Sequence, residues 1–337
     1  MPKVSVIMPI YNTKDEYLRQ AIKSILEQSY EDYEFIILND SPKNLPIKEI
    51  VFTYQDSRIK YFENEQTLGV AKSYNRLLDL AKGDFVAVMN HDDISNPQRI
   101  EKQVSYLENH PEVGLVGTAY KKFGEINRFK TIENPKEDAE IRALLLFKSS
   151  IHHPTTMYRR HLVEEHHIRY KEEYVSLNDR KFYYDIGQYA KLANMPDVLY
   201  RYRFHKDMVS KKMKPEIFEE QCDFHAQWFT EAGIELTEEE KEIFDKYVTK
   251  GKCHIKDVSV LEKIEQVLSK ISKENQKQQL VPTKEFSEVC GRYLVKRCLN
   301  AIVFGGVNSS KLLKKTELPI ANNLLLKTCN LALHWRG

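Results

Sequence analysis

Three short, uninterrupted apolar runs constrain the fold of this chain more than any other feature of its sequence. They are VSVIMPI from Val4, EFIILN from Glu34 and FVAVM from Phe85. A strand with one face in water would alternate apolar and polar residues, and these runs do not. Strands of this kind are covered on both faces, as in a parallel sheet. The runs therefore predict the buried strands of an α/β protein.

Helical patterns fill the intervals between the apolar runs. Thr13 and Glu16 have the spacing of a capping box and predict that a helix begins there. A second helix is predicted after Gly69, and a third with Asn96 as its N-cap and Pro97 as its first residue. This alternation predicts an open doubly wound sheet, in which ligands bind beyond the carboxyl ends of the strands.

Composition narrows the class of protein. Of the 337 residues, 42% are hydrophobic and 30% charged, with a mean hydropathy of -0.54. Those values are typical of a globular protein, and the length favours a main domain with an appendage. The net charge of +2 gives no bulk attraction to nucleic acid. No run of about 18 apolar residues occurs, so no membrane span is predicted.

The cysteines and the first strand indicate the cell compartment. The five cysteines are odd in number and include no CxxC pair, which argues against a disulfide framework. The strand pattern begins at Val4 and leaves no room for a signal peptide before it. These features predict a cytoplasmic protein, with peripheral contact at the inner face of the plasma membrane as a further expectation from its basic end.

The second half of the chain has a different pattern. From about Lys214 no strand pattern recurs, and apolar residues from Val260 to Ile271 repeat at helical spacing. The segment 272–284, SKENQKQQLVPTK, is polar and predicts a linker between two helical subregions. The stripe from Val260 to Ile271 spans too few heptads for a coiled coil, although it would suit a small homodimer contact.

The end of the chain is basic and amphipathic. From Val281 onward there are nine basic residues and three acidic ones. Apolar residues in this region have helical spacing, namely Phe286, Val289, Cys290, Tyr293 and Leu294, and a further group reaches Trp335. Two hypotheses fit this pattern. One is contact with an anionic membrane surface, and the other is packing of the helices against the rest of the protein.

Acidic residues that follow the apolar runs are the strongest chemical signal. Asp40 follows the second run, and Asp92 and Asp93 follow the third, with His91 beside them. In an open sheet these ends meet at one edge, where carboxylates would bind Mg²⁺ or Mn²⁺ and through it the phosphates of a nucleotide. The alternative is that NHDDISNP is a polar turn in which Asp93 or Asn96 caps the next helix.

Glycine-rich phosphate loops are missing from the sequence. Neither GxGxxG after the first strand nor GxxxxGK[ST] occurs. A bound phosphate would therefore be neutralised by a metal ion and side chains. The segment PIYNTKDE also lacks the glycines expected of a nucleotidyltransferase that makes sugar nucleotides.

Five segments occur in a fixed order over roughly residues 1–212. They are VSVIMPIYN, IILNDS, NEQTLGVAKSYN, GDFVAVMNHDDISNPQRIEKQ and PDVLYRYRFH. In their order and spacing the chain resembles family 2 of the glycosyltransferases, the inverting group with the GT-A fold. The resemblance implies a catalytic domain over residues 1–212, with a Rossmann-like open mixed sheet flanked by helices. Residues 213–337 are then a helical C-terminal region for acceptor, membrane-surface or oligomer contact.

The same resemblance assigns a site for the nucleotide sugar. Tyr11 would stack on the base and Asp40 would recognise a uracil-type edge, although ordinary aromatic packing is the alternative for Tyr11. Asp92 occupies the last position of the family's DxD motif and would bind the divalent cation, while Asn90 replaces its first aspartate. The residues implied to contact the nucleotide sugar are Pro9, Tyr11, Asp40, Lys72, Asn90, His91 and Asp92.

Catalytic and acceptor residues are implied in the later segments. Asp179 matches the family's general base, and Asn178 replaces the acid before it; a helix N-cap is the alternative for Asp179. His205 matches a histidine that joins Asp92 in the metal site, although a lone surface histidine is the alternative. His153 is a candidate contact for an acceptor hydroxyl, or part of a turn at HHP. Candidates for the acceptor site or a basic flap are His153, Asn178, Arg203 and Lys206.

Taken together, the sequence predicts an inverting enzyme that uses Mn²⁺ or Mg²⁺ and a UDP-sugar donor. The acceptor is a hydroxyl of a cell-surface glycan, such as lipooligosaccharide, capsule or another polysaccharide. The pattern most resembles bacterial β-1,3-N-acetylhexosaminyltransferases of lipooligosaccharide. Alternatives are a donor such as UDP-galactose, UDP-glucose or dTDP-rhamnose, or a non-catalytic protein that binds sugar nucleotides or glycans.

Overall fold

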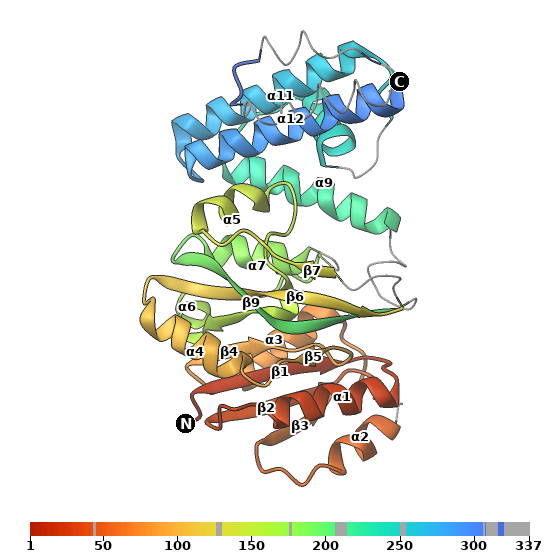
Figure 1. Ribbon diagram of the computed structural model, residues 1–337, viewed down its shortest axis with the longest axis vertical. Helices are drawn as coiled ribbons and strands as arrows, with labels where there is room; N and C mark the ends of the chain where they lie inside the picture. The colour runs from red at the N-terminus through yellow and green to blue at the C-terminus, as the bar shows by residue number, and fades with distance from the viewer. Residues whose placement is uncertain are drawn as a thin grey trace. The chain divides into compact units, whose positions relative to one another are not determined.

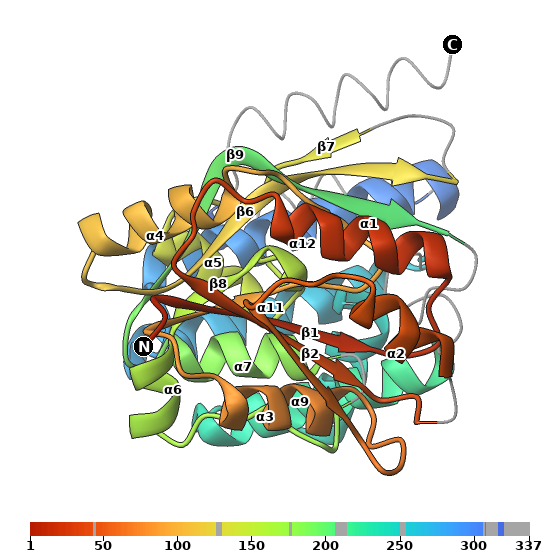
Figure 2. The ribbon, with the colours of Figure 1, turned by 90° about the horizontal axis from the view of Figure 1, so that it is seen from below.

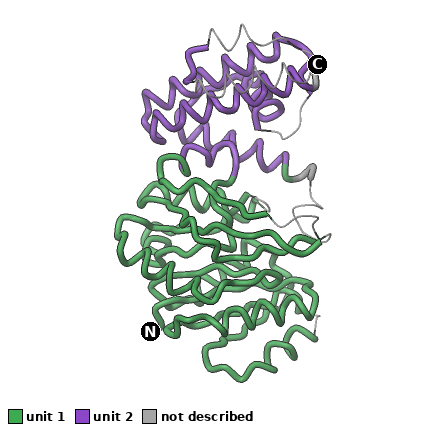
Figure 3. Tube along the Cα trace, viewed as in Figure 1, with its two compact units in different colours: residues 1–141, 149–217 green, residues 142–148, 218–337 purple. Residues whose placement is uncertain are grey.

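A computed structural model of the protein describes residues 1–42, 45–125, 130–174, 177–205, 214–249, 254–305, 307 and 316–319. The chain divides into two compact units (Figure 3). Unit 1 comprises residues 1–141 and 149–217, and unit 2 comprises residues 142–148 and 218–337. The short segment 142–148 thus belongs to the C-terminal unit, although the sequence places it within the expected catalytic domain.

Unit 1 is built on one mixed sheet (Figure 1). Its described strands run in the order β3-β2-β1-β4-β8-β6-β9-β5, and β7 pairs with β6. The strands β3, β2, β1 and β4 are mutually parallel, β8 is antiparallel to both of its neighbours, and β9 is parallel to β6. Their bounds are β1 Val4–Ile10, β2 Tyr33–Asn39, β3 Ile59–Glu63, β4 Phe85–Val88, β5 Ile94–Ser95, β6 Val113–Gly124, β7 Lys130–Ile132, β8 Met157–Arg159 and β9 Lys191–Phe204.

Helices cover both faces of this sheet, so its central strands β1, β2 and β4 are buried along almost their whole length. Figure 2 shows α1 and α4 on one side and α3, α6 and α7 on the other. Alternate β1 residues from Val4 to Ile10 pack with α1, α2 and α4 in one buried cluster. The three predicted buried strands are confirmed as β1, β2 and β4. The helices of this unit are α1 Asp15–Leu26, α2 Leu45–Phe52, α3 Val70–Leu80, α4 Arg99–Asn109, α6 Arg160–Glu165, α7 Asn178–Ile186 and the 3₁₀ turn η1 His153–Thr155.

Two of the predicted helix starts are wrong. No side-chain cap precedes α1, whose N-cap is Lys14 rather than Thr13. The helix α4 begins at Arg99 and not at Pro97, because the Oδ1 atom of Asn96 accepts the backbone N–H of Gln98 at 3.0 Å and forms a turn one step earlier. At Asn96 this local turn replaces the expected cap, whereas α1 simply begins without one.

Helices are the only regular elements among the described residues of unit 2, as the sequence predicts. Helix α5 (Asp138–Leu145) enters it, and α9 (Lys214–Glu231) crosses its other boundary. The remaining helices are α10 Glu238–Ile243, the π-helical turn η2 Phe244–Thr249, α11 Val258–Gln278 and α12 Thr283–Gly305. The predicted linker at 272–284 is wrong for most of its length, because α11 continues to Gln278 and α12 begins at Thr283.

The apolar stripes of unit 2 are used internally. Leu261, Ile264 and Leu268 of α11 are buried, and so are Phe286 and Leu294 of α12. These side chains fill the core between the two helices, so this part of the stripe is not available to a membrane or a second copy. The group around Trp335 lies outside the described residues. No helix in the described part of the chain is long and apolar enough to cross a membrane.

Candidate active site

The carboxyl ends of β1 and β2 are joined by short polar contacts. The backbone N–H of Asn12 donates to the Oγ of Ser41 at 3.0 Å, and the N–H of Asp40 donates to the carbonyl of Ile10 at 2.9 Å. Tyr11, next in the chain, has 52% of its surface exposed. Pro9 lies partly buried on β1 just before it. The structure therefore places Pro9, Tyr11 and Asp40 together, with an aromatic ring free to stack.

Asp40 organises the loop that leads into α3. Its Oδ1 atom accepts the side-chain amide of Asn64 at 2.6 Å and the N–H of Leu68 at 2.8 Å, and its Oδ2 atom accepts the N–H of Gly69 at 2.9 Å. Gly69 has a φ of +88°, a conformation that side chains disfavour. A carboxylate has about four lone-pair sites, so these bonds leave capacity for about one more donor.

The turn after β4 is fixed by Asp93, whose role the sequence did not reveal. Asp93 is fully buried, and its carboxylate accepts the side-chain amide of Asn90, the hydroxyl of Tyr200 and the backbone N–H of Arg203 at 2.7–3.1 Å. Burial and the neighbouring Asp92 raise the pKa of Asp93 well above its usual value. Asp93 thus ties Asn90 and the turn to β9, while the side chain of Asp92 on the same turn stays partly exposed.

Arg203 supports the same turn from β9. Its Nε donates to the carbonyl oxygen of Asp92 at 2.6 Å and its Nη2 to the Oε1 of Gln20 at 2.6 Å. The guanidinium packs over the rings of Tyr17 and Phe123 at 4.1 and 4.4 Å. Arg203 is 7% exposed, so it is a buried brace of the turn rather than part of a flap that moves over the diphosphate. Lys206 lies outside the described residues.

Asp92 and His205 form a partly accessible pair. The Nε2 of His205 lies 3.0 Å from the Oδ2 of Asp92, with side-chain exposures of 12% and 21%. His91, on the same turn, is kept neutral because burial lowers its pKa. A carboxylate and an imidazole fit a divalent cation such as Mn²⁺ or Mg²⁺. No group of three or more His, Cys, Asp or Glu suited to a metal occurs among the described residues, so phosphate and water would complete the coordination.

Asp179 stands in the first turn of α7. Its Oδ1 accepts the N–H of Arg180 at 2.7 Å, and burial raises its pKa to about 6. A carboxyl with this pKa is ionised at neutral pH and basic enough to take up a proton, which suits a general base. Asn178 beside it is 5% exposed, and its Nδ2 atom has no hydrogen-bond partner within the described residues.

One pocket of about 350 Å³ brings the turn after β4 and the start of α7 together. Both Asn90 and Asp179 line it, although 89 positions separate them in the chain. The aromatic part of its wall comes from β6, β9 and the segment before η1. The lining comprises Asn90, Tyr120, Asn134, Ser149, Ile151, His152, His153, Pro154, Asp179 and Tyr202.

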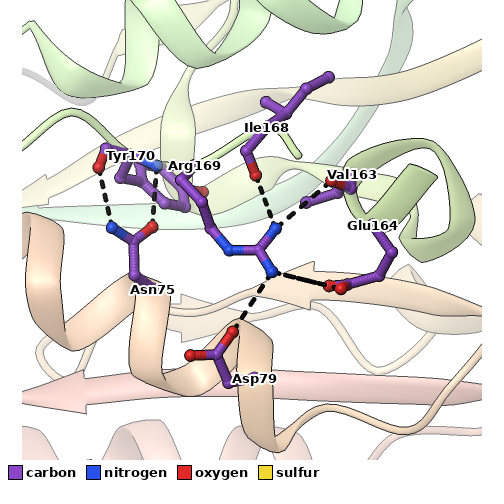
Figure 4. A network of polar contacts seen from close by, with 7 residues as sticks. All are labelled: Asn75, Asp79, Val163, Glu164, Ile168, Arg169 and Tyr170. Carbon is purple, nitrogen blue, oxygen red and sulfur yellow. Dashed lines mark hydrogen bonds and ion pairs between the residues drawn. The ribbon is translucent and has the colours of Figure 1, made fainter. Parts of the chain in front are cut away.

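A network of polar contacts that begins on α3 holds Tyr170 in place (Figure 4), and Tyr170 in turn positions His153. The side-chain amide of Asn75 forms two hydrogen bonds with the backbone of Tyr170, at 2.9 and 2.8 Å. Arg169 next to it bridges Asp79 and Glu164. The hydroxyl of Tyr170 then lies 3.0 Å from the Nε2 of His153, and burial lowers the pKa of His153 to about 3. His153 therefore lines the pocket as a fixed, neutral ring. It also belongs to the turn at HHP, which was the alternative to its role as a contact for an acceptor hydroxyl.

Lys72 is the predicted site residue with the least support from its surroundings. It lies in the first turn of α3 and forms an exposed ion pair with Glu172 at 3.3 Å. By contrast, His152, Tyr120 and Tyr202 line the pocket and were not identified from the sequence. Their only local signal is the pair of adjacent histidines before Pro154, because the tyrosines belong to strands β6 and β9 that meet only in the fold.

The arrangement of unit 1 has known counterparts. The structure is similar to that of S. aureus TarS residues 1–349 in complex with UDP-GlcNAc, with a TM-score of 0.58 and 18% identity over 93% of this chain and 92% of that one. This likeness establishes the fold, a mixed sheet flanked by helices of the GT-A type, and confirms the predicted fold class.

Sequence relatives identify the family. Residues 5–166 match the family described as Glycosyl transferase family 2. The chain is 33% identical over 225 residues to an uncharacterized glycosyltransferase of Haemophilus influenzae, covering 62% of this chain and 68% of the relative. It is 31% identical over 215 residues to the amylovoran biosynthesis glycosyltransferase AmsE of Erwinia amylovora, covering 62% and 79%. The chain belongs to the family 2 glycosyltransferases, enzymes that transfer sugars from sugar-nucleotide donors.

Proposed function

We propose that this glycosyltransferase moves a sugar from a UDP-sugar to a hydroxyl of a cell-surface glycan, with inversion at the anomeric carbon. The observation that carries the proposal is the shared pocket of Asn90 and Asp179. It joins the turn that bears Asp92 to a basic carboxylate. A donor held at the turn and an acceptor hydroxyl near Asp179 would meet there.

The donor half of the proposal rests on the strand ends. Tyr11 is exposed for stacking on a base, and Asp40 is buried beside it with capacity for a further hydrogen bond. Asp92 and His205 would hold a divalent cation against the diphosphate. Such a cation, when bound, stabilises the charge that develops on the leaving UDP. TarS, which shares the fold, binds UDP-GlcNAc, and this supports a UDP-sugar as the donor here.

The acceptor half rests on Asp179. As a carboxylate it would accept the proton of the attacking hydroxyl, whose oxygen forms the new bond to the anomeric carbon as the bond to UDP breaks on the opposite side. With its pKa raised to about 6, Asp179 is ionised at neutral pH and still basic enough to accept this proton. The name of AmsE, a glycosyltransferase of amylovoran biosynthesis, supports a polysaccharide or another cell-surface glycan as the acceptor.

Asp179→Asn tests this proposal most directly. The variant is expected to lose about 10²–10⁴-fold in kcat, the usual contribution of a general base, and to keep its affinity for UDP. Transfer would be followed by mass spectrometry with a donor panel that includes UDP-GlcNAc, and UDP binding by calorimetry. Asp185→Asn is the matched control, because Asp185 lies on the same helix and pairs with Lys181 outside the pocket lining. Full turnover in Asp179→Asn would remove this residue from the mechanism.

A non-catalytic binding protein is the alternative raised by asparagine at positions 90 and 178, where the family resemblance implies acids, and membership of the glycosyltransferase family argues against it. The two candidates differ in one measurement. An enzyme releases UDP from at least one donor when an acceptor glycan or water is present. A binding protein retains the intact sugar nucleotide under both conditions.

A further inference from the structure

Three aromatic rings form one wall of the pocket that contains Asp179. The imidazole of His152 stacks on Tyr120 with ring centroids 3.9 Å apart and an interplanar angle of 17°. It meets Tyr202 edge to face at 4.7 Å and 88°, and the two tyrosines contact each other at 6.0 Å. We call Tyr120, His152 and Tyr202 the aromatic wall. His152 lies at its centre and is in contact with both other rings.

His152 contributes to the wall as a flat, uncharged ring. Burial, assisted by His153 and Lys122, lowers its pKa to about 3, so it carries no charge at neutral pH. Its Nε2 atom is buried and has no hydrogen-bond partner among the residues that the structure describes. If Nε2 bonded a ligand, it would have to be accessible to that ligand, and it is buried. The ring surface, rather than Nε2, is therefore the part of His152 that a ligand would contact.

The charge of the lining restricts the ligand further. Within the described lining, Asp179 is the one carboxylate, and there is no lysine or arginine. His153 is neutral for the same reason as His152. A uronate, a sialate or a phosphorylated sugar would place its negative charge near Asp179 without a described counter-charge. Unpaired like charges in a partly desolvated site are strongly unfavourable.

We propose that this pocket receives an uncharged pyranose of the acceptor glycan, packed against the aromatic wall. The C–H groups on one face of a pyranose are apolar and weakly positive, and they complement the negative face of an aromatic ring. The hydroxyl to be glycosylated then lies within reach of Asp179. This inference rests on the proposed function, because it takes Asp179 as the base and the pocket as the acceptor side.

Paired acceptors test the charge requirement. The two members of each pair share one stereochemistry and differ only at C6, as in p-nitrophenyl β-glucoside with p-nitrophenyl β-glucuronide and p-nitrophenyl β-galactoside with p-nitrophenyl β-galacturonide. The neutral member of an accepted pair is expected to show a kcat/KM at least about tenfold higher than its uronide. Equal or faster transfer to the uronide would overturn the inference, and so would donor hydrolysis with no transfer to any neutral glycoside.

Two substitutions of His152 test the wall itself. His152→Ala removes the central ring and is expected to raise KM for the acceptor about tenfold, with a smaller effect on KM for the UDP-sugar. His152→Phe keeps a flat ring and is expected to restore most of the wild-type KM, because the ring face is retained and the Nε2 that is lost has no partner among the described residues. His166→Ala is the matched control, since His166 stacks on Tyr189 at 3.5 Å outside the pocket lining.

The outcomes separate this inference from the proposed function. If His152→Phe raises KM for the acceptor as much as His152→Ala does, the imidazole acts through its nitrogens, and the proposed packing against the aromatic wall is wrong. If His152→Ala leaves the acceptor KM unchanged, the acceptor does not use the wall. If the wild-type protein releases UDP from none of the donors, the proposed function fails instead. Thermal unfolding of each variant confirms that the changes in KM come from folded protein.

Discussion

The two units of this protein each contain an imidazole–carboxylate pair, and the pairs differ in what surrounds them. In unit 1, His205 and Asp92 keep 12% and 21% of their side chains exposed. In unit 2, His225 and Asp245 keep 1% and 13%. The Nε2 of His225 also donates to the carbonyl of Leu146 at 2.9 Å, so both of its nitrogens are engaged within the core.

This difference separates a pair that can bind a ligand from one that stabilises a fold. Both pairs have the chemistry of a metal site, but a cation needs open coordination positions as well as donor atoms. Asp92 stands on a turn whose other carboxylate, Asp93, is already bonded to the framework, so Asp92 is the carboxylate that we propose for the cation. His225 instead joins η2 to the segment 142–148 and has no position left. Accessibility decides the role, and residue type does not.

Breaking the buried pair should have the largest effect on stability. His225→Ala leaves Asp245 and the Leu146 carbonyl without their partner and is expected to lower the free energy of unfolding by about 3–5 kcal/mol. Chemical denaturation followed by circular dichroism measures this change. His254→Ala, an exposed histidine of the same unit, should change it little. Equal unfolding curves for wild type and His225→Ala would contradict the structural role of the pair.

Breaking the accessible pair should affect ligand binding instead. Asp92→Ala is expected to weaken metal-dependent UDP binding about 100-fold, equivalent to about 2.8 kcal/mol, with little change in unfolding. Calorimetry with and without EDTA measures it. Asp84→Ala is the control, because Asp84 is exposed next to the start of β4 and pairs with Lys3. UDP affinity that responds neither to EDTA nor to Asp92→Ala would exclude a metal at this pair.

A pH series sharpens the contrast between binding and catalysis in unit 1. Because the pKa of Asp179 is raised to about 6, kcat should fall about tenfold for each pH unit below 6 and level off above 7. The same shift makes ionisation unfavourable to the folded state. The protonated form of Asp179 therefore contributes to the free energy of unfolding. This contribution is fully present below the unfolded pKa of about 4 and is lost as pH rises through the folded pKa of about 6.

Asp179→Asn, which stays neutral, should therefore unfold at a higher temperature than wild type above pH 6, and at the same temperature near pH 4. Differential scanning calorimetry at both pH values provides the measurement. A variant that is less stable than wild type at both would show that burial does not control the ionisation of Asp179.

The smallest effect is expected at Lys72. Its ion pair with Glu172 is about half exposed on both sides, so Lys72→Ala should change the free energy of unfolding by no more than about 0.5 kcal/mol. Calorimetry with UDP then isolates any contribution to the nucleotide, with Lys23→Ala as an exposed lysine control on α1. A larger loss of stability would mean that the pair is more than a surface contact.

The sequence predicted the parts of the fold and site that depend on local pattern. Continuous apolar runs identified β1, β2 and β4, and the order of motifs placed Asp92 and Asp179 in one family pattern. The sequence could not show that Asp93, rather than Asp92, anchors the turn, because its partners Tyr200 and Arg203 lie 107 and 110 positions away. The role of Arg203 as a brace depends on the same distant pairing.

The aromatic wall illustrates the same limit. Tyr120 and Tyr202 lie 82 positions apart on two strands that pair in the fold, and in its own segment each has the pattern of an ordinary strand residue. The predicted start of α4 was wrong for a different reason. At Asn96 the side chain bonds the backbone two residues later, and this local turn competes with the cap that the same residue type would otherwise make.

The segment 142–148 gives the protein an order of assembly. Leu145, Leu146 and Phe147 are buried in unit 2, and Phe147 packs with Phe244, Phe286 and Tyr293. During translation this hydrophobic stretch leaves the ribosome long before its partners are made. This stretch therefore stays exposed, or bound by a chaperone, until the C-terminal helices have been synthesised. A shortened chain that ends near residue 217 would keep the whole sheet and still display this stretch permanently, which favours aggregation over a working minimal enzyme.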